Sequence, residues 1–288
     1  MSEITLKPKS LVSETKIPIE VEKSITCDSF NNKSIDEIKK LEAFLGNEKK
    51  TLGDFFDISG EKSEAASMKI IIDGDVWMVK GIGRGMKTGE ILIKGKAGMH
   101  TGEQLAGGKI TVEGDVDAFC FNEMKKGEVL VKGNAGDYFA SAMRGSWVGV
   151  SGGKITIEGN VGIESGIWIK GATAYLRIKG NAGDFLGAHN QGGRIEIDGT
   201  PGNRLGAEMA RGKIIVNGKA TSIMPSFGYK GKVDKILLKK DKKDESKNVY
   251  QQGNYLQFDG DFSQVKAKAK FKGGIFLDAS KNQDLIPK

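Results

Sequence analysis

Eight short stretches of the chain carry aliphatic residues at alternate positions, and each stretch ends two positions before a glycine. The residues two and four positions upstream of that glycine are aliphatic in every copy, for example Ile197 and Ile195 before Gly199. Alternation with period two predicts a β-strand that has one buried face. The eight glycines are Gly74, Gly95, Gly114, Gly133, Gly159, Gly180, Gly199 and Gly218.

These glycines recur every 19 to 26 residues, which indicates a chain built from stacked, similar units. A leucine-rich repeat has a similar period, but the leucine ladder and asparagine of that repeat are absent here. Hexapeptide β-helices repeat over shorter distances. The sequence therefore predicts an all-β fold, a parallel β-helix of about eight turns with a long glycine-rich corner in each turn.

The corners carry glycine at the first, fourth and eighth places, as in GNAGDFLG (180–187). Each turn bends sharply beside neighbouring turns, which calls for positive φ or for backbone contact with no Cβ between. GDVDAFCF (114–121) and GNAGDYFA (133–140) lack some of these glycines, so their corners are expected to differ. The structural turn glycines are Gly74, Gly95, Gly98, Gly102, Gly114, Gly133, Gly136, Gly159, Gly162, Gly166, Gly180, Gly183, Gly187, Gly199, Gly202, Gly206 and Gly218.

The longest gap between turn glycines contains the insertion MRGSWVGVSGG (143–153). Insertions in stacked repeats project from one face, and that face often binds. Arg144 and Trp147 are of residue types enriched at interfaces, so they are candidate interface residues; a simple capping loop is the alternative. Ten positions after the turn glycine, an apolar series is expected to fill the interior of the coils: Leu105, Met124, Met143 and Met209.

The two ends of the chain differ from the repeats. IPIEVE (17–22) alternates like a strand, and 34–46 is predicted to be a helix that begins with a Ser34–Glu37 capping box. VKAKAKFK (265–272) alternates again, with lysines on one side that protect an edge strand. We expect three segments: an N-terminal α+β cap with one helix (1–66), the repeats (67–220) and a Lys-rich C-terminal extension with strands (221–288).

Composition narrows the class of protein. Glycine accounts for 41 of 288 residues, and the net charge of +7 comes largely from C-terminal lysines without interleaved aromatic residues, so nucleic acid is not an expected partner. No apolar run is long enough for a membrane helix. The two cysteines, Cys27 and Cys120, are too few for a disulfide framework, which favours a reducing, cytoplasmic location.

The chain shows no self-sufficient active site. His100 and His189 are placed in equivalent corners at least four turns apart, too far to share a metal. No metalloprotease, phosphate-loop or nucleophile-elbow motif is present, and the acidic residues mostly flank turn glycines, where some could link neighbouring coils. No catalytic, cofactor-binding or metal-binding residue is therefore assigned.

The glycine corners with their I-x-I-x-G strands resemble the GXGXG domain, a right-handed β-helix that ends the large subunit of glutamate synthase. Further segments resemble the C subunit of formylmethanofuran dehydrogenase from methanogenic archaea: LEAFLGNEKKTLGDFFDISG (41–60), the stretch 69–102, MRGSWVGVSGGKITIEGN (143–160) and the stretch 183–216. The likeness is expected to cover residues 1–234, and the tail from Lys235 is expected to lie outside it.

This resemblance implies a non-catalytic assembly subunit of a complex that reduces CO2 and fixes it on methanofuran. It also implies that molybdenum or tungsten pterin, iron–sulfur clusters and binuclear zinc belong to other subunits. Those partners would be molybdopterin-binding, amidohydrolase-like and polyferredoxin-type subunits. Two alternatives remain open at this point: a separate structural subunit of a glutamate synthase-like amidotransferase, and an independent β-helix enzyme acting on carbohydrates.

Overall fold

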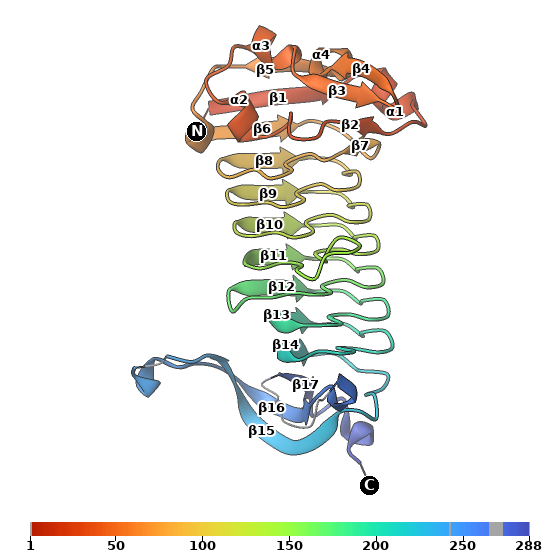
Figure 1. The fold of residues 1–288 in the computed structure, drawn as a ribbon, viewed down its shortest axis with the longest axis vertical. Helices are drawn as coiled ribbons and strands as arrows, with labels where there is room; N and C mark the ends of the chain where they lie inside the picture. Colours follow the sequence, from red (N-terminus) through yellow and green to blue (C-terminus); the bar gives the residue numbers. More distant parts are fainter. Residues whose placement is uncertain (1, 242, 265–272, 288) are drawn as a thin grey trace.

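The computed structural model describes residues 2–241, 243–264 and 273–287. The fold is mostly β, with a 13-stranded mixed sheet and a second sheet of four strands (Figure 1). The strands are β1 (Ser2–Pro8), β2 (Ile19–Glu20), β3 (Glu42–Leu45), β4 (Glu48–Thr51), β5 (Phe56–Gly60), β6 (Met68–Ile72), β7 (Val79–Lys80), β8 (Glu90–Ile93), β9 (Lys109–Val112), β10 (Glu128–Val131), β11 (Gly153–Ile157), β12 (Ala174–Ile178), β13 (Gln191–Ile197), β14 (Arg211–Val216), β15 (Gly228–Lys239), β16 (Val249–Asp259) and β17 (Gly274–Asp278).

The predicted repeat strands stack in sequence order as parallel neighbours, β6, β8 and then β9 to β14. Their register aligns equivalent residues, so Ile91 lies beside Ile110 and Ile195 beside Ile214. All sixteen aliphatic residues predicted to face inward are at most 1% exposed, which confirms the period-two assignment. A shorter ladder of single bridges follows the corners, from Val76 and Ala97 through to Val161 and Ala182.

The corner glycines meet two different constraints. A Cβ added to Gly180 would lie 2.5 Å from the carbonyl oxygen of Gly159 in the preceding coil, far inside van der Waals contact. Gly187, at the eighth place of the same corner, has φ of +68°, which side chains other than glycine rarely adopt. Glycine at the first place lets successive coils approach closely, and glycine at the eighth place lets the chain turn.

Two corners without glycine at the eighth place keep the same backbone. Phe121 and Ala140 stand there with φ of +60° and +55°. The expectation that these corners differ is therefore wrong at this place. Phe121 is fully buried, and a Cβ added to Gly102 in the preceding coil would lie 2.3 Å from its ring. The Phe121 ring thus packs against the space that Gly102 leaves open.

Polar side chains beside the turn glycines also connect the coils. The Asp115 carboxylate accepts a hydrogen bond of 2.8 Å from the backbone N–H of Asn134, whose own side-chain oxygen accepts one from Asn160 N–H at 2.9 Å. Asp137 and Asp184 accept N–H groups of the following coil in the same way. The Asn134 N–H holds the pKa of Asp115 below its usual value. These acidic residues are part of the stack rather than merely solvated.

The N-terminal segment contains four short helices where one was expected: α1 (Ser10–Glu14), α2 (Cys27–Phe30), α3 (Ile35–Lys39) and α4 (Leu52–Phe55). The Ser34–Glu37 capping box is confirmed, with the Ser34 N–H donating to Glu37 at 2.7 Å. The helix predicted over 34–46 is too long, because residues 42–45 form β3. Gly46 has φ of +59° and serves the hairpin between β3 and β4 instead of ending a helix.

Strands from both ends of the chain extend the main sheet. β1 pairs in parallel with β6 and antiparallel with β5, while β17 pairs in parallel with β14 and leads to the β15–β16 hairpin. In the second sheet, β2 lies between β3 and β7, which confirms a strand within 17–22.

Short 3₁₀ turns lie at Ala65–Ser67, Glu245–Lys247, Phe262–Gln264 and Gln283–Leu285. The strand predicted over 265–272 falls outside the described residues. Among the helices of the described ranges, none is long and apolar enough to cross a membrane.

Substitution of an inward residue tests the stack. Ile197→Asp places a carboxylate where the side chain is fully buried, and we expect a loss of more than about 4 kcal/mol or failure to fold. Thr156→Asp, on the outward side of β11, is the control and is expected to cost about 1 kcal/mol or less. Chemical denaturation monitored by circular dichroism measures both. An unchanged midpoint for Ile197→Asp would contradict the inward assignment.

Candidate interaction surface

Six residues, each five positions after a turn glycine, form one column along the stacked coils. We call this set the Phe119 column: His100, Phe119, Tyr138, Glu164, Phe185 and Arg204. All six have φ between +55° and +62°, a conformation that residues with side chains keep only where their surroundings determine it. The rings of Phe119 and Tyr138 stack at 4.6 Å, and His100 continues the stack at 5.5 Å from Phe119. The column is therefore an ordered row of mostly aromatic groups.

A second column lies nine positions after each turn glycine. We call it the Trp168 column: Gln104, Glu123, Ala142, Trp168, His189 and Glu208. The rings of Trp168 and His189 are stacked with their centres 4.2 Å apart and their planes nearly parallel, at 2°. His189 Nδ1 lies 3.4 Å from the Glu208 carboxylate, and Gln104 donates a hydrogen bond of 3.0 Å to Glu123. Equivalent side chains of neighbouring coils thus contact one another in this column too.

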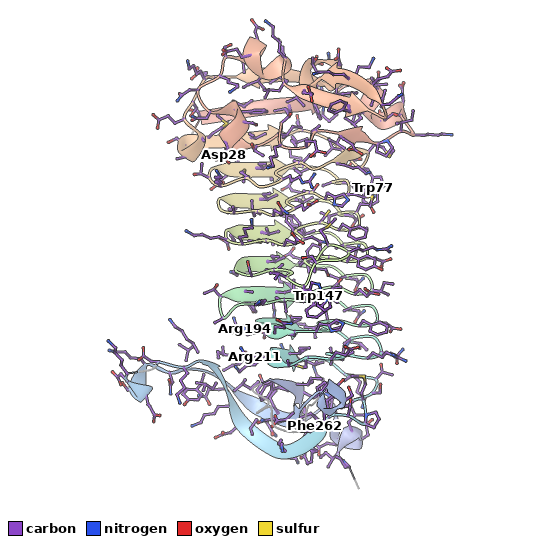
Figure 2. All side chains as sticks on the ribbon, viewed as in Figure 1. Asp28, Trp77, Trp147, Arg194, Arg211 and Phe262 are labelled. Atoms are coloured by element: carbon purple, nitrogen blue, oxygen red, sulfur yellow. The ribbon has the colours of Figure 1, made fainter. Side chains whose placement is uncertain are left out.

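The insertion predicted from the irregular spacing contacts both columns. The Trp147 ring packs edge-on against Trp168 at 5.2 Å and is 71% exposed, and Figure 2 labels it beside the stacked coils. The Arg144 guanidinium lies 5.4 Å from the Tyr138 ring centre and donates to the Tyr138 hydroxyl at 3.4 Å. The two candidate interface residues therefore lie on the same surface as the columns.

A cavity of about 370 Å³ lies between the two columns and the insertion. Aromatic walls come from Tyr138, Phe185 and Trp168, and Glu164 is also among the lining residues. The insertion contributes residues 143–146, and Ala142 and His189 line the cavity on the side of the Trp168 column. We refer to this space as the Glu164 cavity.

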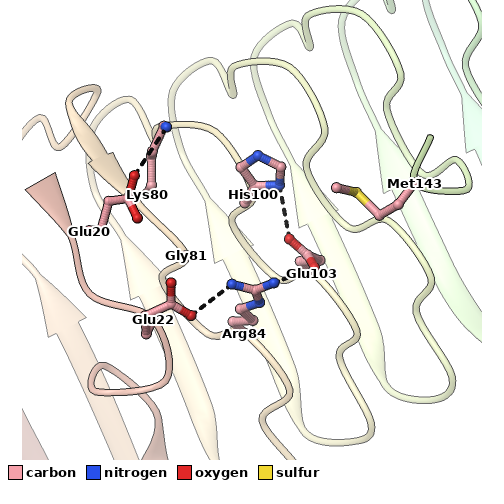
Figure 3. Close-up of a pocket in the computed structure, with 8 residues that line it drawn as sticks. All are labelled: Glu20, Glu22, Lys80, Gly81, Arg84, His100, Glu103 and Met143. Carbon is pink, nitrogen blue, oxygen red and sulfur yellow. Dashed lines mark hydrogen bonds and ion pairs between the residues drawn. The ribbon is translucent and has the colours of Figure 1, made fainter. Parts of the chain in front are cut away.

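A smaller cavity of about 150 Å³ lies where the N-terminal segment meets the coils, lined mainly by charged residues (Figure 3). Arg84 donates to Glu22 at 2.8 Å and to Glu103 at 2.9 Å. It thereby links the turn after β2 to the coil that contains Glu103. The second Glu103 oxygen lies 2.9 Å from His100 Nδ1, but without hydrogen-bond alignment. Burial alone would raise the pKa of Glu103; His100 and Arg84 outweigh it and lower that pKa.

The structure corrects the placement of the two histidines. His100 belongs to the Phe119 column and His189 to the Trp168 column, so their corner positions are not equivalent. The apolar series ten positions after the turn glycine is confirmed at Leu105, Met124 and Met209, which are fully buried. It is wrong at Met143, because the insertion begins there and Met143 lines both cavities.

The side chains of the described residues do not fit a metal or iron–sulfur centre. Burial raises the pKa of the Cys27 thiol to about 12 and raises that of Cys120 as well, so both sulfurs keep their protons. Cys120 donates to the Gly98 carbonyl at 3.3 Å. Within the ranges that the structure describes, no group of three histidine, cysteine, aspartate or glutamate side chains could hold a metal ion.

The sequence contains a signal for the two columns. Counting five or nine positions from each turn glycine collects His100, Phe119, Tyr138 and Phe185 in one series and Trp168 with His189 in the other. The alternation of inward aliphatic residues reveals the strands but not these outward series. The irregular spacing around 143–153 selected a region that lies beside both columns, but it did not reveal the columns themselves.

Glu103 gives a test of the charged cavity by pH. Its pKa is lowered in the fold, so its ionised form stabilises the folded state fully above the ordinary value of 4.5, and this contribution is lost as pH falls further. Glu103→Gln should lower the free energy of unfolding by about 1–3 kcal/mol at pH 7 and by progressively less below pH 4.5. Urea denaturation at a series of pH values measures this difference. Glu128→Gln, on an exposed strand position, is the control. If the loss of unfolding free energy in Glu103→Gln does not change with pH, the charge of the Glu103 carboxylate is not its cause.

The chain is similar to known proteins in parts of its sequence. No protein-family profile matches it. It is 52% identical over 103 residues to the C subunit of the tungsten-containing formylmethanofuran dehydrogenase 2 of Methanothermobacter marburgensis, a match covering 35% of this chain and 37% of that relative. It is 43% identical over 97 residues to the C subunit of the molybdenum-containing formylmethanofuran dehydrogenase 1 of Methanothermobacter thermautotrophicus, covering 34% of this chain and 23% of the relative. Each of these two matches covers 37% or less of the length of the relative.

The fold also occurs in a solved structure, the formyltransferase/hydrolase complex from Methylorubrum extorquens in complex with methylofuran. One chain of it superposes with a TM-score of 0.75 and 22% identity, over 96% of this chain and 99% of that chain. This likeness shows the fold.

One relative aligns along its full length. The C subunit of the tungsten-containing formylmethanofuran dehydrogenase 2 of Methanococcus maripaludis is 38% identical over 286 residues, 99% of this chain and 100% of the relative. The expectation that the tail from Lys235 lies outside the similarity is therefore wrong. With identity of this extent across the repeats and both ends, the chain belongs to the family of formylmethanofuran dehydrogenase C subunits.

Proposed function

We propose that the chain is a non-catalytic assembly subunit of a formylmethanofuran dehydrogenase complex, which reduces CO2 reversibly with ferredoxin-type electrons and fixes it on methanofuran. The observation that carries this proposal is the 38% identity to a C subunit of such an enzyme along 99% of the chain. The groups most suited to chemistry have structural partners: the Cys27 and Cys120 thiols are buried, and Glu103 contacts Arg84 and His100. Family membership argues against the amidotransferase and carbohydrate-enzyme alternatives.

In this proposal, the repeats form a right-handed parallel β-helix of about eight turns, spanning 67–220. Residues 1–66 and 221–288 are the segments that close its two ends. The in-register parallel pairs from β6 to β14 and the second ladder of bridges at the corners support this description. A stack of this kind offers long side faces of fixed spacing, which suits a subunit that holds others in place.

The cofactors of the complex belong to its other subunits in this proposal. The names of the relatives specify tungsten or molybdenum, and we assign the metal pterin, the iron–sulfur clusters and the binuclear zinc to molybdopterin-binding, polyferredoxin-type and amidohydrolase-like partners. The partner surface would be the two columns together with Arg144 and Trp147. Its support is the exposure of Trp147 and the residue types involved, since tryptophan and arginine are enriched where interfaces bind most strongly.

The metal content of the chain tests this proposal. The tagged chain, purified gently from a methanogen, should carry partner subunits together with tungsten or molybdenum, iron and zinc. The same full chain produced alone should contain substoichiometric amounts of all four elements and show no formylmethanofuran activity. Mass spectrometry of the co-purified proteins and elemental analysis measure the two states. Stoichiometric tungsten, molybdenum or zinc in the chain alone would contradict a non-catalytic role, and absence of partners in the gentle purification would contradict an assembly role.

A further inference from the structure

The Phe119 column has a gap in its aromatic series. Rings stack from His100 to Tyr138, the next coil contributes Glu164, and a ring returns at Phe185. Neighbouring coils keep the same register there. The Tyr138 N–H donates to the backbone carbonyl of Ile163 at 2.9 Å, and the Glu164 N–H donates to the backbone carbonyl of Asp184 at 2.8 Å. With strands about 4.8 Å apart, a planar group placed midway would lie within the roughly 4.5–7 Å range of stacked rings from Tyr138 and from Phe185. The gap therefore has the height of one planar group.

The group that would occupy this gap should be cationic. Glu164 lines the cavity, and among the described residues its carboxylate has neither a hydrogen bond nor an ion pair. The neighbouring acids differ, since Glu103 contacts Arg84 and Glu208 contacts His189. A carboxylate in a cavity lined by the rings of Tyr138, Trp168 and Phe185 is an environment in which a cation gains from both charge and aromatic contact.

The chain already uses this chemistry on both sides of the gap. Arg144 lies 5.4 Å from the centre of the Tyr138 ring, and Arg204 lies 5.4 Å from the centre of Phe185. In the described residues, neither guanidinium reaches ion-pair distance from Glu164. Arg144 lines the Glu164 cavity but contacts Tyr138. Among the described residues, the cavity therefore offers aromatic walls and a carboxylate that no cation reaches.

We propose that the Glu164 cavity binds an arginine side chain of a partner subunit, stacked between Tyr138 and Phe185 and paired with the Glu164 carboxylate. Arginine fits better than lysine, because its planar guanidinium can stack on both faces and donate two hydrogen bonds to one carboxylate. The exposed Trp147 ring, which packs on Trp168, would cover apolar parts of the same partner segment. This inference rests on the proposed assembly function and specifies the chemistry of its interface.

The test uses the assembled complex. Glu164→Gln keeps the shape of the side chain and removes its charge, and we expect the tagged subunit to dissociate from its partners about tenfold faster or more. Trp168→Ala should act in the same direction. The matched control is Glu158→Gln in the same coil, where the carboxylate forms an exposed ion pair with Lys179 and no change is expected. Surface-immobilised complex, with release of partners followed over time at several salt concentrations, gives the rates.

A second readout uses the full chain alone, which separates binding from any effect of the variants on assembly. Addition of N-acetyl-arginine amide should shift NMR signals of Trp168 and Tyr138 in the wild-type chain and in Glu158→Gln, and should shift them less in Glu164→Gln. N-acetyl-lysine amide should have a weaker effect. If the wild type holds its partners and Glu164→Gln behaves as Glu158→Gln in both experiments, the arginine site is wrong while the assembly role stands. If the wild type holds no partners, both are wrong.

Discussion

The close approach of successive coils is the constraint on which the structure depends. Backbone groups of neighbouring corners lie so near one another that a Cβ at Gly180 would collide with Gly159. Inward aliphatic residues such as Ile195 and Ile214 can stack only while that spacing holds, because each coil buries its apolar side against the next. Glycine is costly in conformational entropy, but here it removes the atoms that would hold the coils apart.

The same spacing organises the outer surface. A regular stack places equivalent side chains of neighbouring coils side by side, so the rings of Phe119 and Tyr138 stack, and so do those of Trp168 and His189. Where the insertion joins this surface, the two columns line a cavity with the Glu164 carboxylate, which has no ion-pair partner in the described part of the chain. A core built on stacked aliphatic pairs, with Phe121 and Phe139 also buried in it, thus carries aromatic and charged columns outside it, which suits the proposed assembly role.

Much of the fold could be predicted because its repeat leaves a strong sequence signal. Alternation around Ile197 identified the strands and their buried face, and the spacing of the turn glycines identified stacking. The ends were harder: the stretch with Leu41 and Leu45 fits a helical pattern as well as the hairpin it forms, and only tertiary pairing decides between them. The site was harder still. Arg144 and Trp147 became candidates through the irregular spacing, but Glu164 is distinctive only when its column neighbours are known.

In the proposed assembly, this regular stack presents the two columns and the insertion to partner subunits. Hydroxyl-radical footprinting of the free chain and of the assembled complex tests it most directly, with Trp147 as the reporter and Trp77, which is 41% exposed and lies outside both columns, as the internal reference. The account predicts that oxidation of Trp147 is fast in the free chain and strongly suppressed in the complex, relative to Trp77. Equal oxidation of Trp147 in the two states would contradict it.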